Sequence, residues 1–192
     1  MSAEFKTTLP LLTADTAQGD AADGLRAAEK AMGFAPNMYK AMANAPAVFA
    51  GYNAGYARFR SESGFTSVEQ EVVFLVVSRG NGCEYCVSAH SFVADAMSKV
   101  PTEVTDAIRD GRPIADATLQ ALATFTQAMF DSRGKPTQAQ AQAFLDAGYT
   151  EQHILYLILA IAVKTFSNYT NHIFHTPLDE AFAARKWSAK AA

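Results

Sequence analysis

The chain has 192 residues, of which 49% are apolar and 18% charged, and its net charge is −3; this composition is that of a globular protein with one sizeable core and excludes a disordered chain. The slight negative charge excludes a basic surface for nucleic acid or an acidic membrane. Because no basic leader precedes a long apolar run, and the longest such run (154–163) covers only about half a bilayer, we expect a cytoplasmic protein without a membrane partner.

Helix signals recur along the chain, and hairpin signals are scarce. Proline at the first helical position, capping boxes, and glycine after the last helical residue mark the ends of the expected helices. The segments predicted to be helical are 21–32, ending at Gly33; 46 to about 61, before Gly64; 102 to near Gly111; 115–130; and a segment from the capping box of Thr137 and Gln140 to Gly148.

Two continuously apolar segments, 72–77 and 154–163, are compatible with buried strands or buried helices on periodicity alone. Their N-terminal flanks favour helices. Capping-box patterns at Thr66 and Ser67 precede the first run, and Gly148 and Thr150 precede the second. We therefore predict two core helices.

The same two segments form an internal repeat with an offset of 82 residues, in which 69–90 aligns with 151–172. The aligned polar residues differ at the chemically interesting positions: Glu71 becomes His153, Cys83 becomes Thr165, Cys86 becomes Asn168, and His90 is retained as His172. The alternative is a coincidence between two amphipathic segments. The repeat predicts two helical hairpins that pack their apolar runs together, only the first of which carries chemistry.

The fold class expected from these patterns is all-α, a helical bundle with an internal two-fold repeat. We predict a single domain over residues 1–192, with an N-terminal extension over 1–30 and pseudo-repeats over about 45–100 and 115–175.

The two cysteines, Cys83 and Cys86, are three positions apart. A disulfide between them would close a loop too small to add much stability, which favours a catalytic or metal-binding role. Gly-Asn-Gly at 80–82 ends the preceding helix, so a new helix should begin near Cys83. On that helix Cys83, Cys86 and His90 fall at about 0°, 300° and 340°, and all three share one face.

Two thiols and an imidazole on one helix face can carry redox chemistry. The first helical turn favours the thiolate, which is the attacking species, and His90 can take and return a proton. A second cysteine can convert a sulfenic acid to a disulfide. Glu71 lies 12 residues before Cys83, and in a helical hairpin its carboxylate would approach His90. The alternative for Glu71 is a solvated acid in a first helical turn.

Other interpretations of these residues stay open at this point. A zinc site would need a fourth ligand, from Glu71 or a distant histidine, and a buried pair of cysteines can be inert. Haem attachment is excluded because Val87, not histidine, follows Cys86. His172 and His175 offer another metal pair, against the simpler interpretation of polar residues that close a helix.

The spacing Glu71-x11-Cys83-x2-Cys86-x3-His90 resembles the active-site signature of the alkyl hydroperoxidase D family, within the wider carboxymuconolactone decarboxylase-like superfamily. The sequences FLVVSRGNGCEYCVSAH and FSNYTNHIFHTPLDEAF look like its peroxidase-related branch. The resemblance covers about residues 30–185. It implies an all-α fold with a two-fold repeat and subunits that assemble as trimers or higher oligomers.

By motif position, the resemblance implies that Cys86 is the peroxidatic thiol with His90 as its base, and that Cys83 resolves it through an intramolecular disulfide. Glu71 would belong to the proton relay. In the founding members a histidine directly precedes the second cysteine, whereas this chain has Tyr85. A phenol is a poor base at neutral pH, although it can donate a hydrogen bond to a thiolate or a bound peroxide.

The function predicted from the sequence is therefore that of a thiol-dependent peroxidase without cofactor or metal. Its partners would be a hydroperoxide substrate, a dithiol or thiol-protein electron donor, and further copies of the chain in a trimer or hexamer. The alternative is a thiol–disulfide redox sensor or chaperone-like module without significant peroxide turnover. Lactone decarboxylation is discounted, because that side of the superfamily generally lacks the cysteine pair.

Overall fold

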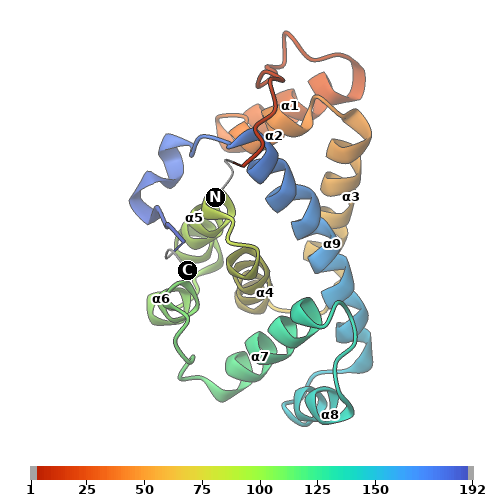
Figure 1. Cartoon of the computed structure of the whole chain (residues 1–192), viewed down its shortest axis with the longest axis vertical. Helices are drawn as coiled ribbons and strands as arrows, with labels where there is room; N and C mark the ends of the chain where they lie inside the picture. Colours follow the sequence, from red (N-terminus) through yellow and green to blue (C-terminus); the bar gives the residue numbers. More distant parts are fainter. Residues whose placement is uncertain (1–3, 190–192) are drawn as a thin grey trace.

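The computed structural model describes residues 4–189, and every regular element in this range is a helix (Figure 1). The prediction of an all-α fold is confirmed. The elements in chain order are α1 (Gly19–Met32), α2 (Asn37–Met42), α3 (Pro46–Glu62), α4 (Ser67–Gly80), α5 (Glu84–Val93), the π-helix η1 (Ala94–Ser98), α6 (Thr102–Asp110), α7 (Ala117–Asp131), α8 (Gln138–Asp146), α9 (Glu151–Phe174) and the 3₁₀ helix η2 (Glu180–Arg185).

Helix α4 is the central element of the bundle, and α5, α6, α7 and α9 pack around it (Figure 1). Its residues 70–78 are all buried, which explains why the apolar run 72–77 shows no amphipathic period. Thr66 is the N-cap of this helix: its hydroxyl accepts a hydrogen bond from the backbone N–H of Glu69, and the Glu69 carboxylate accepts one from the N–H of Thr66. The predicted core helix is confirmed.

The other predicted helix ends are also confirmed. Thr137 and Gln140 form a capping box at the start of α8, and Gly33 and Gly111 end α1 and α6 in the left-handed conformation. Three short elements, α2, η1 and η2, were not predicted, because five or six residues are too few to establish a helical period.

The predicted second hairpin is wrong, because α9 is one unbroken helix of 24 residues. Gly80, Asn81 and Gly82, which end α4, correspond in the repeat to Ala162, Val163 and Lys164. Gly82 has a backbone φ of +66°. Residues other than Gly, Asn and Asp seldom adopt this left-handed conformation. The second copy has no residue suited to that turn, and the helix continues.

The N-terminal segment contributes to the core, since Leu25 on α1 is fully buried and α1 packs against α3. Helix α3 in turn lies along α9 (Figure 1). This approach is close: a Cβ atom on Gly55 would lie 2.8 Å from Cγ2 of Val163. None of the helices in the described part of the chain is both long and apolar enough to cross a bilayer.

Candidate active site

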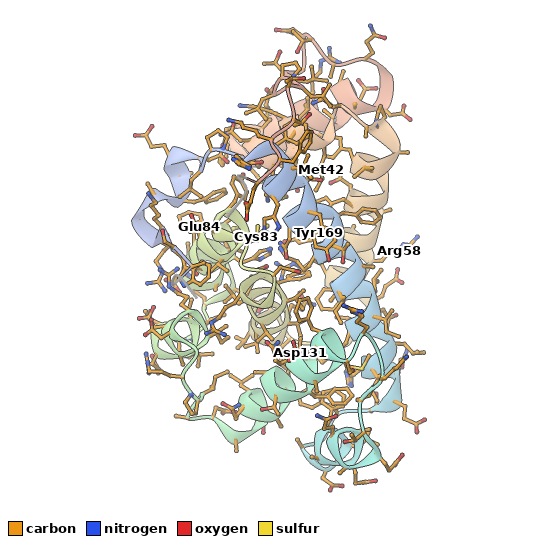
Figure 2. All side chains as sticks on the ribbon, in the orientation of Figure 1. Met42, Arg58, Cys83, Glu84, Asp131 and Tyr169 are labelled. Carbon is orange, nitrogen blue, oxygen red and sulfur yellow. The ribbon has the colours of Figure 1, made fainter. Side chains whose placement is uncertain are left out.

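The break between α4 and α5 sets the position of both cysteines. The chain turns at 80–82, the backbone N–H of Cys83 donates to the carbonyl of Ser78 at 3.0 Å, and Cys83 becomes the N-cap residue of α5. Cys86 follows in the first helical turn, as predicted. Figure 2 shows Cys83 and Glu84 at this end of α5. Both cysteines are free thiols, and both are buried.

A buried polar stripe on α9 faces the two sulfurs. The amide Nδ2 of Asn171 donates to Sγ of Cys86 at 3.2 Å and lies 3.9 Å from Sγ of Cys83. Oδ1 of Asn168 accepts a hydrogen bond from Nδ2 of Asn81 at 2.8 Å, which ties the break to α9. The stripe consists of Lys164, Ser167, Asn168 and Asn171, all at most 4% exposed. Counted from Lys164, these four residues lie at positions i, i+3, i+4 and i+7, so they share one helix face.

The predicted contact between Glu71 and His90 is present. Oε2 of Glu71 lies 2.8 Å from Nδ1 of His90, and Oε1 pairs with the guanidinium of Arg60 on α3. The carboxylate is completely buried, so it is not the solvated acid that was the alternative. Because Glu71 binds Nδ1, the ring nitrogen left to exchange protons is Nε2.

The two thiols differ in acidity. Burial would raise the pKa of Cys86, but a hydrogen bond with Cys83 and the positive charge of Lys164 bring it well below its usual range. His90 acts in the same direction when it is protonated. The hydrogen bond to Cys86, together with burial, raises the pKa of Cys83. Cys86 is therefore the thiol that ionises first, and Cys83 keeps its proton.

The relay residues are also perturbed. Burial and the nearby Lys164 lower the pKa of His90, although Glu71 acts in the opposite direction. Burial would raise the pKa of Glu71, but His90 and Arg60 hold it below its usual value. The site at neutral pH therefore contains an ionised carboxylate and an imidazole able to accept a proton.

A surface pocket of about 460 Å³ reaches Cys83 and Asn171. Cys86 does not line it. His172 and His175, the pair of histidines near the end of α9, lie in its wall. A small molecule in this pocket would meet the Cys83 sulfur and the Asn171 amide before it met Cys86.

Tyr85 lies beside the cysteines but directs its hydroxyl elsewhere. The hydroxyl donates to Oδ2 of Asp179 and accepts a hydrogen bond from the backbone N–H of Met38 at 3.4 Å. Asp179 also accepts hydrogen bonds from the backbone N–H of Asn37 at the start of α2. In this arrangement Tyr85 joins α5 to α2 and the C-terminal segment, and its hydroxyl is not placed to bond a thiolate.

Within the described residues, no group of three or more His, Cys, Asp or Glu side chains is arranged to hold a metal ion. The fourth ligand that a zinc site would need is therefore not gathered around Cys83, Cys86 and His90. His172 and His175 form no such group either.

Sequence reasoning missed three side chains of this site: Arg60, Lys164 and Asn171. The last two carried a readable signal, because polar residues at 164, 167, 168 and 171 form one stripe on an otherwise apolar helix. Arg60 carried none. It lies in the last turn of α3, where a basic residue needs no functional explanation.

Comparisons with known proteins agree with this architecture. The model of the carboxymuconolactone decarboxylase family matches residues 46–128, a range that contains both cysteines, Glu71 and His90. None of the curated protein sequences matches the chain.

Three solved structures share the fold over nearly the whole chain. A peroxidase-related protein from Ralstonia eutropha JMP134 with an alkylhydroperoxidase AhpD core has a TM-score of 0.81 at 20% identity, over 91% of this chain and 93% of the other. A peroxidase-related protein from Silicibacter sp. TM1040 has a TM-score of 0.78 at 18% identity, over 96% of each chain. A cysteine-to-alanine variant of the debrominase Bmp8, in complex with 2,3,4-tribromopyrrole, has a TM-score of 0.76 at 18% identity, over 95% of this chain and 97% of the other. Residues 46–128 thus match the carboxymuconolactone decarboxylase family model, and the chain has the fold of the alkylhydroperoxidase AhpD core.

Proposed function

We propose that the protein is a thiol-dependent peroxidase that reduces hydroperoxides at Cys86. The observation that carries the proposal is the position of the Cys86 sulfur, which lies 3.2 Å from the Asn171 amide and one helical turn before His90. His90 is in turn bound to the buried carboxylate of Glu71. The site thus combines a thiol, a base one helical turn away, and a carboxylate that orients the base, which are the groups that nucleophilic catalysis uses.

In the proposed reaction the Cys86 thiolate attacks the distal oxygen of the hydroperoxide. The O–O bond breaks and an S–O bond forms, which gives a sulfenic acid and an alkoxide. The alkoxide takes a proton from solvent through His90 and leaves as the alcohol. The Cys83 thiol then attacks the sulfenic sulfur, so that an S–S bond forms and water leaves. The peroxide gains two electrons, and the two thiols lose them.

In this proposal, the surface pocket that reaches Cys83 serves the reductive half of the cycle. Cys83 lines the pocket and Cys86 does not, so an incoming dithiol or thiol protein would attack the disulfide at Cys83. The released Cys86 would return to its acidic state. The second thiol of the donor then completes the exchange and leaves as a disulfide.

We further propose that the chain forms a homo-oligomer, a trimer or hexamer, through α9. Several large apolar side chains are exposed along this helix, and exposed apolar patches of this kind mark sites of protein–protein contact. These side chains are Leu155, Ile158, Phe166, Tyr169 and Ile173, each between 39% and 66% exposed.

Two cysteine variants test the peroxidase proposal. Cys86→Ser should consume no organic hydroperoxide, whereas Cys83→Ser should consume one equivalent per chain and then stop with a sulfenic acid on Cys86. The wild type should turn over only when a dithiol is supplied. Cys86→Ser consuming peroxide at the wild-type rate would overturn the proposal. A single oxidation of the wild type, with no turnover and a change in assembly, would favour a redox sensor instead.

A second candidate activity is reductive debromination, favoured by the whole-chain similarity to a debrominase. Two adjacent thiols could supply the two electrons, replacing bromine by hydrogen and releasing bromide as the disulfide forms. Bromide release from a brominated pyrrole, in the presence of a dithiol and without peroxide consumption, would select this activity over the first.

A further inference from the structure

Lys164 is a buried lysine at the centre of the site. Its side chain is 1% exposed, and its Nζ lies over the ring of Phe74 at 5.5 Å from the centroid. The imidazole of His90 also packs against that ring, at 4.9 Å between centroids. None of the ion pairs among the described residues includes Lys164. A buried ammonium without a carboxylate is costly, so its counter-ion has to be sought elsewhere.

The buried carboxylate in this part of the core is already engaged. One oxygen of Glu71 pairs with Arg60, and the other binds His90. Arg60 and Glu71 therefore balance each other, and Lys164 is left with one positive charge. The group nearby that can supply a negative charge is a cysteine.

We propose that Lys164 is the counter-ion of the Cys86 thiolate, a positioning residue that keeps this sulfur ionised in a buried site. Lys164 and Asn171 lie seven positions apart on α9, which is two helical turns, so both belong to the face that meets α5. Asn171 contacts the Cys86 sulfur directly at 3.2 Å. In this arrangement Asn171 donates a hydrogen bond to the thiolate and Lys164 supplies the charge.

The acidity of Cys86 supports this assignment. Burial opposes ionisation, but hydrogen bonding to Cys83 and the charge of Lys164 lower the pKa of Cys86. The helices around the site also carry other titratable or charged groups: Tyr52 and Arg60 on α3, Glu71 on α4, and Cys83, Tyr85 and His90 at the start of or on α5. Arg60 is the permanent cation among these groups, and it is already paired with Glu71.

The pairing has a consequence for the disulfide state. When Cys86 forms a disulfide it loses its negative charge, and Lys164 loses its counter-ion. This stabilises the reduced form relative to the oxidised form, so the disulfide should be readily reduced by a donor thiol.

The test is the pH profile of Cys86 alkylation by iodoacetamide in a Cys83→Ser background, which isolates one thiol. Replacing Lys164 by Met removes the charge with little change in length. We expect Lys164→Met to raise the midpoint of the profile by about 1–3 pH units, as expected for loss of a nearby opposite charge. Lys164→Arg keeps the charge and should leave the midpoint near that of the parent. A structural role alone would affect both variants and would not separate them by charge.

An unchanged midpoint in Lys164→Met would overturn the proposal. Far-UV circular dichroism and thermal melting establish that each variant is folded. If Lys164→Met does not fold, Lys164→Gln provides the same comparison with Lys164→Arg. The parent protein gives an independent check, because absence of thiolate ultraviolet absorbance at neutral pH would also overturn the proposal. The inference rests on the proposed function only in taking Cys86 as the reactive thiol, and alkylation needs no peroxide. A protein that does not reduce peroxide can therefore still support or refute it.

Discussion

The carboxylate of Glu71 on α4 lies 2.8 Å from Nδ1 of His90 on α5, and both side chains are buried. The two residues are 19 positions apart, and the turn at 80–82 is what brings them together. This contact sets the orientation of the imidazole and leaves Nε2 for proton exchange. The proposed chemistry therefore depends on a hydrogen bond between the two helices that this turn connects.

Replacing Glu71 by Gln should reduce both activity and stability. The amide can still accept a hydrogen bond from Nδ1, but the negative charge that supports a protonated His90 is lost, and we expect peroxide reduction to slow about 100-fold or more. Arg60 would lose its buried partner, which should lower the free energy of unfolding by about 3–5 kcal/mol. Steady-state peroxide consumption and urea unfolding measure the two effects.

The control is Glu62→Gln, which breaks the exposed pair with Arg58 on the surface of α3. Because that pair is exposed to solvent, the change should leave both the free energy of unfolding and the activity close to those of the wild type. If Glu71→Gln behaves like this control, the relay is not part of the mechanism.

The hydroxyl of Tyr85 should matter for stability rather than for thiol reactivity. Tyr85→Phe leaves the buried Asp179 carboxylate without this donor, at a cost of about 1–3 kcal/mol in the free energy of unfolding. Cys86 alkylation should keep its rate. A double-mutant cycle with Asp179→Asn should show strong coupling between the two side chains. Slower peroxide reduction by a Tyr85→Phe variant of normal stability would instead give Tyr85 a role at the thiolate.

Acidification should destabilise the folded protein. The pKa of His90 is lowered from 6.5, mainly by burial, so just below pH 6.5 the unfolded chain binds a proton more readily than the folded one. The free energy of unfolding must then fall as the pH decreases through this range. The lowered pKa of Glu71, ordinarily 4.5, extends the loss to lower pH. Urea unfolding at several pH values checks this, and His90→Asn should flatten the first part of the curve. Equal slopes in the wild type and the variant would refute the assignment to His90.

Two glycines of α3 offer a matched test of the packing against α9. A Cβ on Gly55 would meet Val163 at 2.8 Å, whereas a Cβ on Gly51 would lie 3.7 Å from the ring of Phe166. Gly55→Ala should therefore lower the free energy of unfolding by about 1–3 kcal/mol. Gly51→Ala should be neutral or raise it by up to about 1 kcal/mol through helix propensity. Thermal melts of both variants decide the point, and a stabilised Gly55→Ala would show that the helices can separate without cost.

Helix ends were predictable because the signals are local. Thr66 and Thr137 bond groups within three residues, and Gly33 and Gly111 act through their own backbone. The cysteine face was predictable for the same reason, since Cys83 and His90 lie within two turns of one helix.

Contacts between distant parts of the chain were not predictable in this way. Arg60 reaches Glu71 across the turn between α3 and α4, and Lys164 approaches the site from a helix more than 70 positions beyond Cys86. The repeat aligned α9 with the helix that precedes the cysteines, and both segments are helices. It failed to show that α9 would continue, because that depends on which residues replace Gly80 and Gly82, not on the apolar pattern.

Treatment with one equivalent of an organic hydroperoxide, followed by mass mapping of the cysteine peptides, tests the central claim most directly. The account predicts one alcohol released per chain and a disulfide that joins Cys83 to Cys86, seen as the loss of two hydrogens from a single peptide. Two cysteines that remain fully alkylatable after this treatment, with the hydroperoxide unconsumed, would contradict it.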